Sequence, residues 1–463
     1  MRLSPRLFRA LGWCAAVIGA SAAPFIALAS LEGDAVAVRG FFVTTVLGLF
    51  LGGTILAGTA RLTRPAGAAA ALRLAFYAWV LTPLLAAPPL AGAGGAVSAA
   101  FEAYGALTTT GAVLMEPEAA SRAVVLWRCY LGWLGGLGSL VLAATVFAAL
   151  DRRGVGLRRT SLLTVERSDL FTNFGRGFRR LGAVYAIVTG AGFVGLMAGG
   201  AAPFDALCLA LSGVSTSGLA PQSGPLADWL TAPAILVLAG LCLAGAWNFA
   251  VMYEWMSRYR IQRGTGELRA MAGVAVFCGV AALLVAGPDA AAGGFLDGLF
   301  AISTAGHQTV AASVLPAAAL FFLALVGGAT ISTSGGMKMP RVLLLLRRAG
   351  GELSVLSHPS AAVRTRFGGR PVSDSALAGV WVYALAFPVA LGAGAAAVAL
   401  GGAEFDAAWR AAAASLSNMG PPAADDFAVL SPASKIACIV LMVAGRLEVM
   451  AAAAALYVIF ARD

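Results

Sequence analysis

Four short turns of small and polar residues recur along the chain, and each has a glycine in its third position. Each turn lies between two long apolar stretches. Glycine allows such a turn to present backbone carbonyl oxygens, and four turns around one axis would replace the hydration shell of a cation. The turns are Thr109-Thr110-Gly111, Thr216-Ser217-Gly218, Thr304-Ala305-Gly306 and Asn418-Met419-Gly420.

The tripeptide Thr-x-Gly is weak evidence when it is taken without its surroundings. The chain contains 57 glycines, and the pattern occurs again at Thr333-Ser334-Gly335, where no short acid-led segment precedes it. The fourth turn has Asn418 where the others have threonine. The glycine position therefore predicts the cation filter better than the threonine does, and the elements around it must decide.

Composition places the chain in a membrane. It is 60% hydrophobic and 12% charged, with a mean hydropathy of +0.85, whereas soluble domains carry about 25% charged residues. These values exclude a water-soluble enzyme, and the length fits about ten membrane-spanning helices. The six cysteines lie in or beside apolar stretches without metal-ligand spacing, so we interpret them as small buried residues.

The net charge of +10 indicates membrane orientation rather than nucleic-acid binding. Basic residues gather at both ends and in loops near 61–73, 152–180, 258–269 and 338–370, and the loops between them are acidic or nearly uncharged. By the positive-inside rule, the basic loops and both termini are cytoplasmic. The arginine-rich start resembles a signal peptide, but a second apolar span at 36–58 favours a retained hairpin.

The same order of segments recurs four times between the basic loops. A long apolar span is followed by a short segment of roughly 9–14 residues, a glycine turn and a second long span. Such a short segment cannot cross a bilayer, and the basic loops share one side only if it dips in and returns. The opening spans lie near 71–93, 181–202, 269–290 and 376–400, and the closing spans near 122–149, 230–253, 315–346 and 433–461.

Each short segment begins with a phenylalanine close to an acid. The acids are Glu102, Asp205, Asp297 and Asp406. We interpret them as N-caps of four short helices at the membrane interface. The C-termini of these helices would direct partial negative charge toward the membrane centre, which favours a cation there.

These features resemble the Trk/Ktr/HKT superfamily of potassium transporters, most closely its TrkH-type membrane subunits. The similar segments are FEAYGALTTTGA at 101–112, WRCYLGWLGGLGSLVLA at 127–143, FDALCLALSGVSTSGL at 204–219, GGATISTSGGMKMPR at 327–341, SNMGP at 417–421 and GRLE at 445–448. The resemblance implies an all-α integral membrane protein with an N-terminal two-helix hairpin and four helix–pore-loop–helix repeats around a central pore. The expected units are 1–60 for the hairpin and 61–153, 154–260, 261–350 and 351–463 for the repeats.

The resemblance also implies potassium uptake across the cytoplasmic (inner) membrane and no enzymatic activity. Potassium ions would bind at the four turns, with Thr109, Gly111, Thr216, Gly218, Thr304, Gly306, Asn418 and Gly420 as ligands. In this superfamily glycine at all four filter positions goes with potassium, whereas serine at the first goes with sodium in some plant relatives. His307 and Pro422 depart from the usual flanking residues.

The partners implied by the resemblance are a second copy of this chain and a cytoplasmic TrkA-type ring that binds NAD or ATP. This chain has no nucleotide-binding fingerprint, so we expect no organic cofactor in it and no nucleic-acid partner. The basic loops at 151–180 and 341–370 are candidate docking surfaces for the ring, or contacts for anionic lipid in the bilayer.

Two features suggest control of conduction. Residues 327–338 are so rich in glycine and serine that we expect the helix to break there, and in the superfamily this stretch is a gating loop. Arg446 lies within the last apolar span, where a charge must face water or a partner. We expect it to face the pore or to latch the loop, since Glu448 lies on another helix face. The predicted gating residues are Gly327, Gly328, Ser334, Gly335, Gly336, Lys338 and Arg446.

Alternatives stay open at this point. The 327–338 stretch could be a capped helix end with Lys338 at the cytoplasmic interface, and Arg446 could snorkel to that interface. An ion-coupled secondary transporter of a small solute would show inverted repeats and intramembrane carboxylates, but the units here share one orientation. A sodium-permeable cation pore is a further alternative. The spans offer no catalytic constellation for a membrane enzyme.

Overall fold

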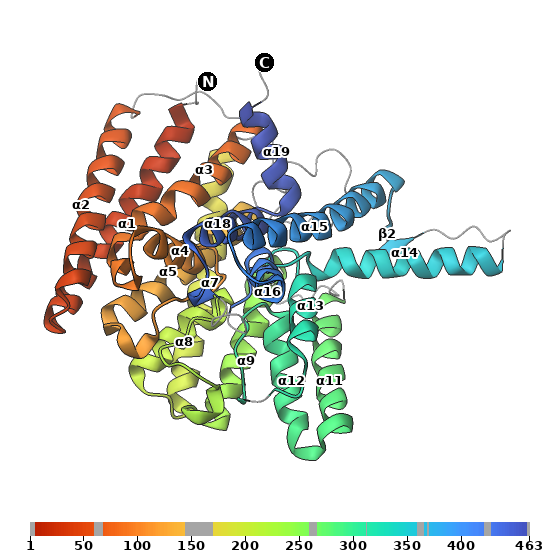
Figure 1. Ribbon diagram of the computed structural model, residues 1–463. Helices are drawn as coiled ribbons and strands as arrows, with labels where there is room; N and C mark the ends of the chain where they lie inside the picture. Colours follow the sequence, from red (N-terminus) through yellow and green to blue (C-terminus); the bar gives the residue numbers. More distant parts are fainter. Residues whose placement is uncertain are drawn as a thin grey trace.

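The protein is a helical membrane protein whose helices surround a buried centre (Figure 1). The computed structural model describes residues 5–59, 68–143, 170–258, 266–311, 313–358, 365–367, 370–420 and 427–460. The only strands in these ranges are two short strands of two residues each, β1 (Arg366–Phe367) and β2 (Arg370–Pro371), which pair antiparallel. The predicted all-α membrane fold is confirmed.

The chain begins with the predicted hairpin of two long helices, α1 (Pro5–Leu31) and α2 (Ala35–Gly58). The Asp34 side chain caps α2 by accepting hydrogen bonds from the N–H groups of Val36 and Ala37. Gly19 and Gly48 face each other across the pair, so the backbones of the two helices approach closely. The hairpin also packs along the short 3₁₀ helix η1 (Pro88–Ala93).

Four units of similar construction follow the hairpin, and each contains an opening helix, a short helix and a closing segment. The opening helices are α3 (Ala68–Ala86), α7 (Leu170–Ala198), α11 (Glu267–Ala286) and α15 (Asp374–Leu400). The short helices are α4 (Ala96–Leu107), α8 (Pro203–Ser215), α12 (Pro288–Ile302) and α16 (Phe405–Ser417). Two further 3₁₀ turns are η2 (Pro117–Ala119) and η5 (Leu226–Asp228).

The closing segments differ from one unit to the next. In the first unit, α5 (Arg122–Leu142) is a single helix. In the second and fourth units, α9 (Ala232–Ala246) with α10 (Phe249–Arg258) and α18 (Pro432–Arg446) with α19 (Val449–Phe460) are bent by 98° and 102°. In the third, α13 (Ala317–Val326) and α14 (Met339–Ser357) are separated by residues 327–338. The predicted break is therefore present, whereas the two sharp bends had no counterpart in the sequence prediction.

By length and composition, the described helices supply fewer membrane spans than the predicted number of about ten. Among the described residues, six helices are long and apolar enough to cross a membrane, and the two bent pairs raise this to eight. The remaining two predicted spans correspond to α3 and to the interrupted α13–α14 segment.

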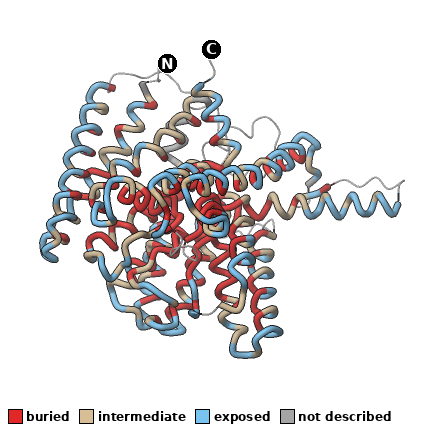
Figure 2. Tube along the Cα trace, in the orientation of Figure 1, coloured by how far each residue is buried: buried red, intermediate tan, exposed pale blue. Residues whose placement is uncertain are grey.

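Burial is concentrated where the short helices meet, at the centre of the molecule (Figure 2). Large apolar side chains on the outer helices are exposed instead, for example Phe50, Phe277 and Leu284, as expected for surfaces that face lipid. The start of α1 and the end of α19 lie on the same side, and α14 extends away from the helical body (Figure 1).

The predicted unit boundaries compare unevenly with these elements. Those at residues 60, 153 and 260 lie outside the described residues, as do Pro422 and most of the basic loop at 151–180. The boundary at residue 350 falls within α14, which continues to Ser357. The predicted burial of the cysteines is confirmed for five of the six, since Cys14 is half-buried.

Candidate cation filter and gate

The four glycine turns share one unusual backbone conformation. In each, the residue two positions before the glycine has a positive φ: 58° at Thr109, 52° at Thr216, 63° at Thr304 and 51° at Asn418. Asparagine tolerates this left-handed region, but a β-branched residue there is a clear outlier, and such strain concentrates at functional sites. The glycines of the first three turns also have positive φ, between 68° and 70°.

Each turn begins where a short helix ends, and its amides fold back onto that helix. The returning hydrogen bonds run from Thr110 N to Gly105 O, Ser217 N to Ser212 O, Gly306 N to Phe300 O and Met419 N to Ala414 O. At least one amide of each turn is therefore occupied, and the partially negative C-termini of four helices meet at the turns. This is the arrangement of charge that stabilises a cation.

The turns are neighbours in a closed ring, which we number 1 to 4 in chain order. A Cβ on Gly111 of turn 1 would collide with the carbonyl oxygen of Ser217 in turn 2, and a Cβ on Gly218 would collide with that of Ala305 in turn 3. Gly306 adjoins Gly420 of turn 4, where a Cβ on Gly306 would lie 3.0 Å from the Gly420 carbonyl carbon. The ring closes because Asn418 Nδ2 donates to Thr110 Oγ1 at 3.1 Å. All predicted filter residues are buried and lie together.

None of the four acids that we interpreted as helix N-caps occupies that position. Asp205 and Asp406 lie in the first turns of α8 and α16, but the N-cap residues are Ala202 and Glu404, and neither helix has a side-chain capping hydrogen bond. Glu102 and Asp297 lie inside α4 and α12, which begin earlier than predicted, at Ala96 and Pro288. Both side chains are buried and bind the chain that leaves the glycine turn. The N-cap interpretation is therefore wrong for all four acids, because the N-cap residues are Gly95, Ala202, Gly287 and Glu404.

The 327–338 loop lies directly against the turns. Gly335 N donates to Thr304 Oγ1 at 2.8 Å, and Thr333 Oγ1 donates to the carbonyl oxygens of Val214 and Gly245, each at 2.9 Å. A Cβ on Gly335 would collide with Ser417 O, next to turn 4. The loop thus touches elements of units 2, 3 and 4, and Thr333-Ser334-Gly335 is part of this loop rather than a fifth turn.

Two buried cations hold this loop from different sides. Arg446 Nη1 donates to Thr333 O at 2.7 Å, and Nη2 donates to Ser139 Oγ of α5. Lys338 Nζ donates to Ser332 Oγ and to Ser334 O within the loop. Both side chains are 8% exposed and bind groups inside the protein. This burial favours the predicted contact with the loop over side chains that extend into solvent.

Glu448 pairs with Arg341 rather than with Arg446, the basic residue two positions before it. Its carboxylate forms an ion pair with Arg341 of α14, whose guanidinium also lies 4.2 Å from the centre of the Tyr383 ring. Glu448 has a φ of 63° at the bend between α18 and α19. The expectation that Glu448 is a poor partner for Arg446 agrees with this geometry.

Comparison with known proteins places this architecture in a family. The sequence model of the TrkH family, described as "Cation transport protein", matches residues 79–272 and 284–461, which is well over half of the chain. The chain belongs to the TrkH family. The match starts after the N-terminal hairpin and includes all four glycine turns and the 327–338 loop.

Individual relatives of this TrkH-family chain agree with that assignment. A "Trk system potassium uptake protein TrkH" from Halomonas elongata is 28% identical over 392 residues, covering 80% of this chain and 81% of the relative. "Trk system potassium uptake protein TrkG" from Escherichia coli is 27% identical over 443 residues, covering 88% and 89%. The crystal structure of the potassium transporter TrkH from Vibrio parahaemolyticus matches with a TM-score of 0.86 at 23% identity, over 99% of this chain and 98% of that one.

Several residues at the TrkH-family site were missed by sequence reasoning. Ser139, Arg128 and Arg341 each bind a predicted site residue or an acid beside it, yet all three lie far from their partners in the chain. A basic residue in an apolar helix was the available signal for Arg128, as it was for Arg446. His307, which follows the third filter glycine, has its ring buried edge-on against Phe300.

Proposed function

We propose that this chain conducts potassium ions across the cytoplasmic membrane and into the cell through a filter formed by turns 1 to 4. The observation that carries the proposal is the convergence of four turns that share a left-handed residue two positions before a glycine, each at the C-terminus of a short helix. Membership of a family of cation transport proteins, and relatives that are named potassium uptake proteins, support the same conclusion.

The proposed ligands are backbone and hydroxyl oxygens of the turns. A carbonyl oxygen is an uncharged donor with two lone pairs, and a ring of such oxygens can replace the hydration shell of potassium at modest cost. The carbonyl groups of Ser217 and Ala305 already lie beside the glycine of the preceding turn. The proposed ligands are Thr109, Gly111, Thr216, Gly218, Thr304, Gly306, Asn418 and Gly420, and no other cofactor is proposed.

The 327–338 loop is the proposed gate. It lies against turns 2, 3 and 4, and it is anchored by Arg446 from the bend that follows α18. Displacement of the loop would remove backbone and side chains from beneath the turns, and the glycines at its ends supply the backbone freedom for that movement. Arg446 therefore stabilises the closed arrangement in this proposal.

The partners belong to the same proposal. A homodimer and a cytoplasmic TrkA-type ring that binds NAD or ATP would act on the loop from the cytoplasmic side, where both termini are also placed. Helix α14 follows the loop directly and extends from the helical body (Figure 1), so it is the element through which a partner could pull on Lys338 and its neighbours.

The deciding experiment combines growth and flux. The chain is expressed in a bacterium that lacks potassium uptake, and growth is scored at low potassium; the purified protein is then placed in liposomes for rubidium and sodium flux. We expect growth rescue, and rubidium flux well above sodium flux. Equal fluxes would instead identify a sodium-permeable pore, and the absence of any flux with or without a ring subunit would refute cation transport.

A further inference from the structure

Two buried carboxylates occupy equivalent places in units 1 and 3. Glu102 lies nine residues before Gly111, and Asp297 lies nine residues before Gly306. Glu102 is 1% exposed inside the short helix α4, and Asp297 is 3% exposed inside the short helix α12. Neither acid caps its helix, so another interaction must compensate for the cost of burying each carboxylate.

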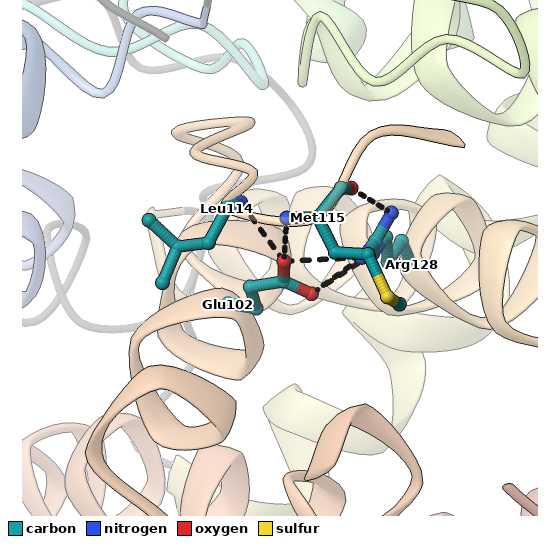
Figure 3. Close-up of polar contacts among 4 residues, drawn as sticks. All are labelled: Glu102, Leu114, Met115 and Arg128. Carbon is teal, nitrogen blue, oxygen red and sulfur yellow. Dashed lines mark hydrogen bonds and ion pairs between the residues drawn. The ribbon is translucent and has the colours of Figure 1, made fainter. Parts of the chain in front are cut away.

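Glu102 binds the chain segment that leaves turn 1 (Figure 3). Its Oε1 accepts hydrogen bonds from Leu114 N at 2.8 Å and Met115 N at 2.9 Å, three and four residues after Gly111. Arg128 of α5 pairs with the carboxylate, with Nη2 2.7 Å from Oε2, and donates from Nη1 to Met115 O at 3.0 Å. The acid and the arginine thus hold both backbone groups of Met115.

Asp297 binds the corresponding segment after turn 3. Its Oδ1 accepts from Thr309 N at 3.0 Å, three residues after Gly306, and its Oδ2 accepts from Ser313 Oγ at 2.6 Å. The carbonyl of Thr309 is used as well, because it accepts from Ala227 N at 3.0 Å. Here no arginine takes part among the described residues, so the shared element is the bond from carboxylate to the amide three residues beyond the glycine.

Units 2 and 4 have no acid at the equivalent position. The ninth positions before their glycines are Leu209 and Ala411. Their own acids lie in the first helical turn: Asp205 accepts from the Gln222 side chain, and Asp406 pairs with Arg410 four residues along the same helix. Asp205 makes no bond to a backbone amide of the described segment after Gly218, and residues 421–426 after Gly420 lie outside the described residues.

The units with a buried acid and the units without one occupy defined places around the ring. Turn 1 adjoins turns 2 and 4, and turn 3 also adjoins turns 2 and 4. Turns 2 and 4 approach each other as well, since a Cβ on Gly420 would lie 3.2 Å from Gly218 Cα, whereas the atoms nearest to a Cβ on Gly111 or on Gly306 belong only to turns 2 and 4. Turns 1 and 3 therefore face each other across the axis. The two braced turns form one diagonal of the ring, and the two turns without an equivalent acid form the other.

We propose that Glu102 and Asp297 are positioning residues for conduction, which fix the outer ends of turns 1 and 3 so that the filter is rigid along one diagonal. The inference rests on the proposed function, since it assigns a role within that filter. Discrimination between two ions of similar chemistry depends on where the oxygen ligands are held, and a ligand that is free to move by about 1 Å loses it. The braces supply that restraint from outside the ligand set.

The test compares four single variants in liposomes by the ratio of rubidium to sodium flux. Glu102→Gln and Asp297→Asn remove the charge that accepts from the backbone, and Asp205→Asn and Asp406→Asn are the matched controls in the other two units. We expect the ratio to fall on the order of tenfold in the first two variants. The two controls should stay within about twofold of the wild type.

A variant that merely weakens folding would lower both fluxes together and leave their ratio unchanged. Folding is checked by thermal unfolding in detergent, and hydrogen exchange is followed at Leu114, Met115 and Thr309, which should exchange faster in the braced-site variants only. If Glu102→Gln does not fold, Glu102→Asp keeps the ion pair but withdraws the carboxylate by one methylene, and it should lower the ratio in the same direction.

An unchanged ratio in folded Glu102→Gln and Asp297→Asn overturns the inference, as does an equal fall in the two controls. Absence of any cation flux in the wild-type protein is a separate result, because it refutes the proposed function. In that case hydrogen exchange still decides the structural part: unchanged exchange at Leu114, Met115 and Thr309 would overturn the brace itself.

Discussion

Arg446 Nη1 donates a hydrogen bond to Thr333 O at 2.7 Å, although 113 residues separate the two in the chain. The donor lies at the bend between α18 and α19, and the acceptor lies in the 327–338 loop. A charge-assisted hydrogen bond in a buried site is among the stronger single contacts in a protein. This contact therefore connects the position of the loop to the conformation of the last closing segment.

Replacement of Arg446 by glutamine should open the pathway. The variant loses the charge that holds Thr333 O and Ser139 Oγ, and a loss of about 1.5–3 kcal/mol from the closed arrangement would raise its open fraction by roughly tenfold or more. The measurement is rubidium flux into liposomes without a ring subunit. Lys435→Gln, a loss of the same charge near the start of α18, is the control and should leave the flux unchanged. Flux in Arg446→Gln equal to that of the wild type would contradict the latch.

Addition of a single methyl group at Gly111 should damage the filter. A Cβ there would collide with Ser217 O and would lie 3.2 Å from the Cα of Gly420, and the φ of 68° is unfavourable for alanine. Gly111→Ala should lower rubidium flux and its ratio to sodium flux, each by about tenfold or more. Gly53→Ala is the matched control, since a Cβ at that position meets nothing within 4 Å. A Gly111→Ala protein with wild-type selectivity would show that turn 1 is not part of the filter.

The positions of the four glycine turns could be predicted from the sequence because the spacing and charge of neighbouring segments are local signals. Each glycine follows a short apolar segment between spans whose basic loops share one side, and the structure brings these four glycines together. The break at 327–338 was equally readable, because glycine and serine are concentrated there. The left-handed conformation at Thr109, Thr216 and Thr304 was not readable, since threonine disfavours it and the fold imposes it.

The starts of two short helices were misjudged, and with them the role of two acids. The signals were present: Gly94 and Gly95 have positive φ directly before α4, and Pro288 follows Gly287 at the first position of α12. An acid after phenylalanine looked like a stronger marker. The partners of Glu102 and Arg446 could not be predicted, because they come from segments that only the tertiary fold brings near.

The Arg341–Glu448 ion pair should contribute far more stability than a surface pair on the same helix. Arg341 is nearly enclosed by Glu448, Met337 O and the Tyr383 ring, whereas the pair Arg348–Glu352 is exposed. Arg341→Met would leave the Glu448 carboxylate without its cation, at a cost of about 3 kcal/mol. Arg348→Met should cost about 0.5 kcal/mol or less.

Thermal unfolding in detergent measures the loss of stability in Arg341→Met and in Arg348→Met. The double variant Arg341→Met with Glu448→Gln should recover part of the loss, because the uncompensated charge is then removed. Equal effects of Arg341→Met and Arg348→Met would contradict the assignment of this pair as a tie between α14 and the α18–α19 bend.

The glycine seam between α1 and α2 should affect stability without affecting selectivity. A Cβ on Gly48 would lie 2.6 Å from Gly19 Cα and 2.8 Å from Ala15 O, so Gly48→Ala must push the two helices apart. Overpacking of this kind costs about 1–3 kcal/mol. Gly53→Ala, on the open face of the same helix, should be neutral or stabilising by up to about 1 kcal/mol, because alanine favours the helix.

The ratio of rubidium to sodium flux then distinguishes a loss of stability in the hairpin from a change of selectivity in the filter. The hairpin contacts α3, η1 and α5, and Thr44 Oγ1 donates to Leu85 O at 3.1 Å, but no hydrogen bond joins it to a glycine turn among the described residues. Gly48→Ala should therefore unfold at a lower temperature than Gly53→Ala while both keep the wild-type ratio of rubidium to sodium flux. A selectivity change in Gly48→Ala would mean that displacement of the hairpin reaches turn 1 through η1 and α4, which pack against each other.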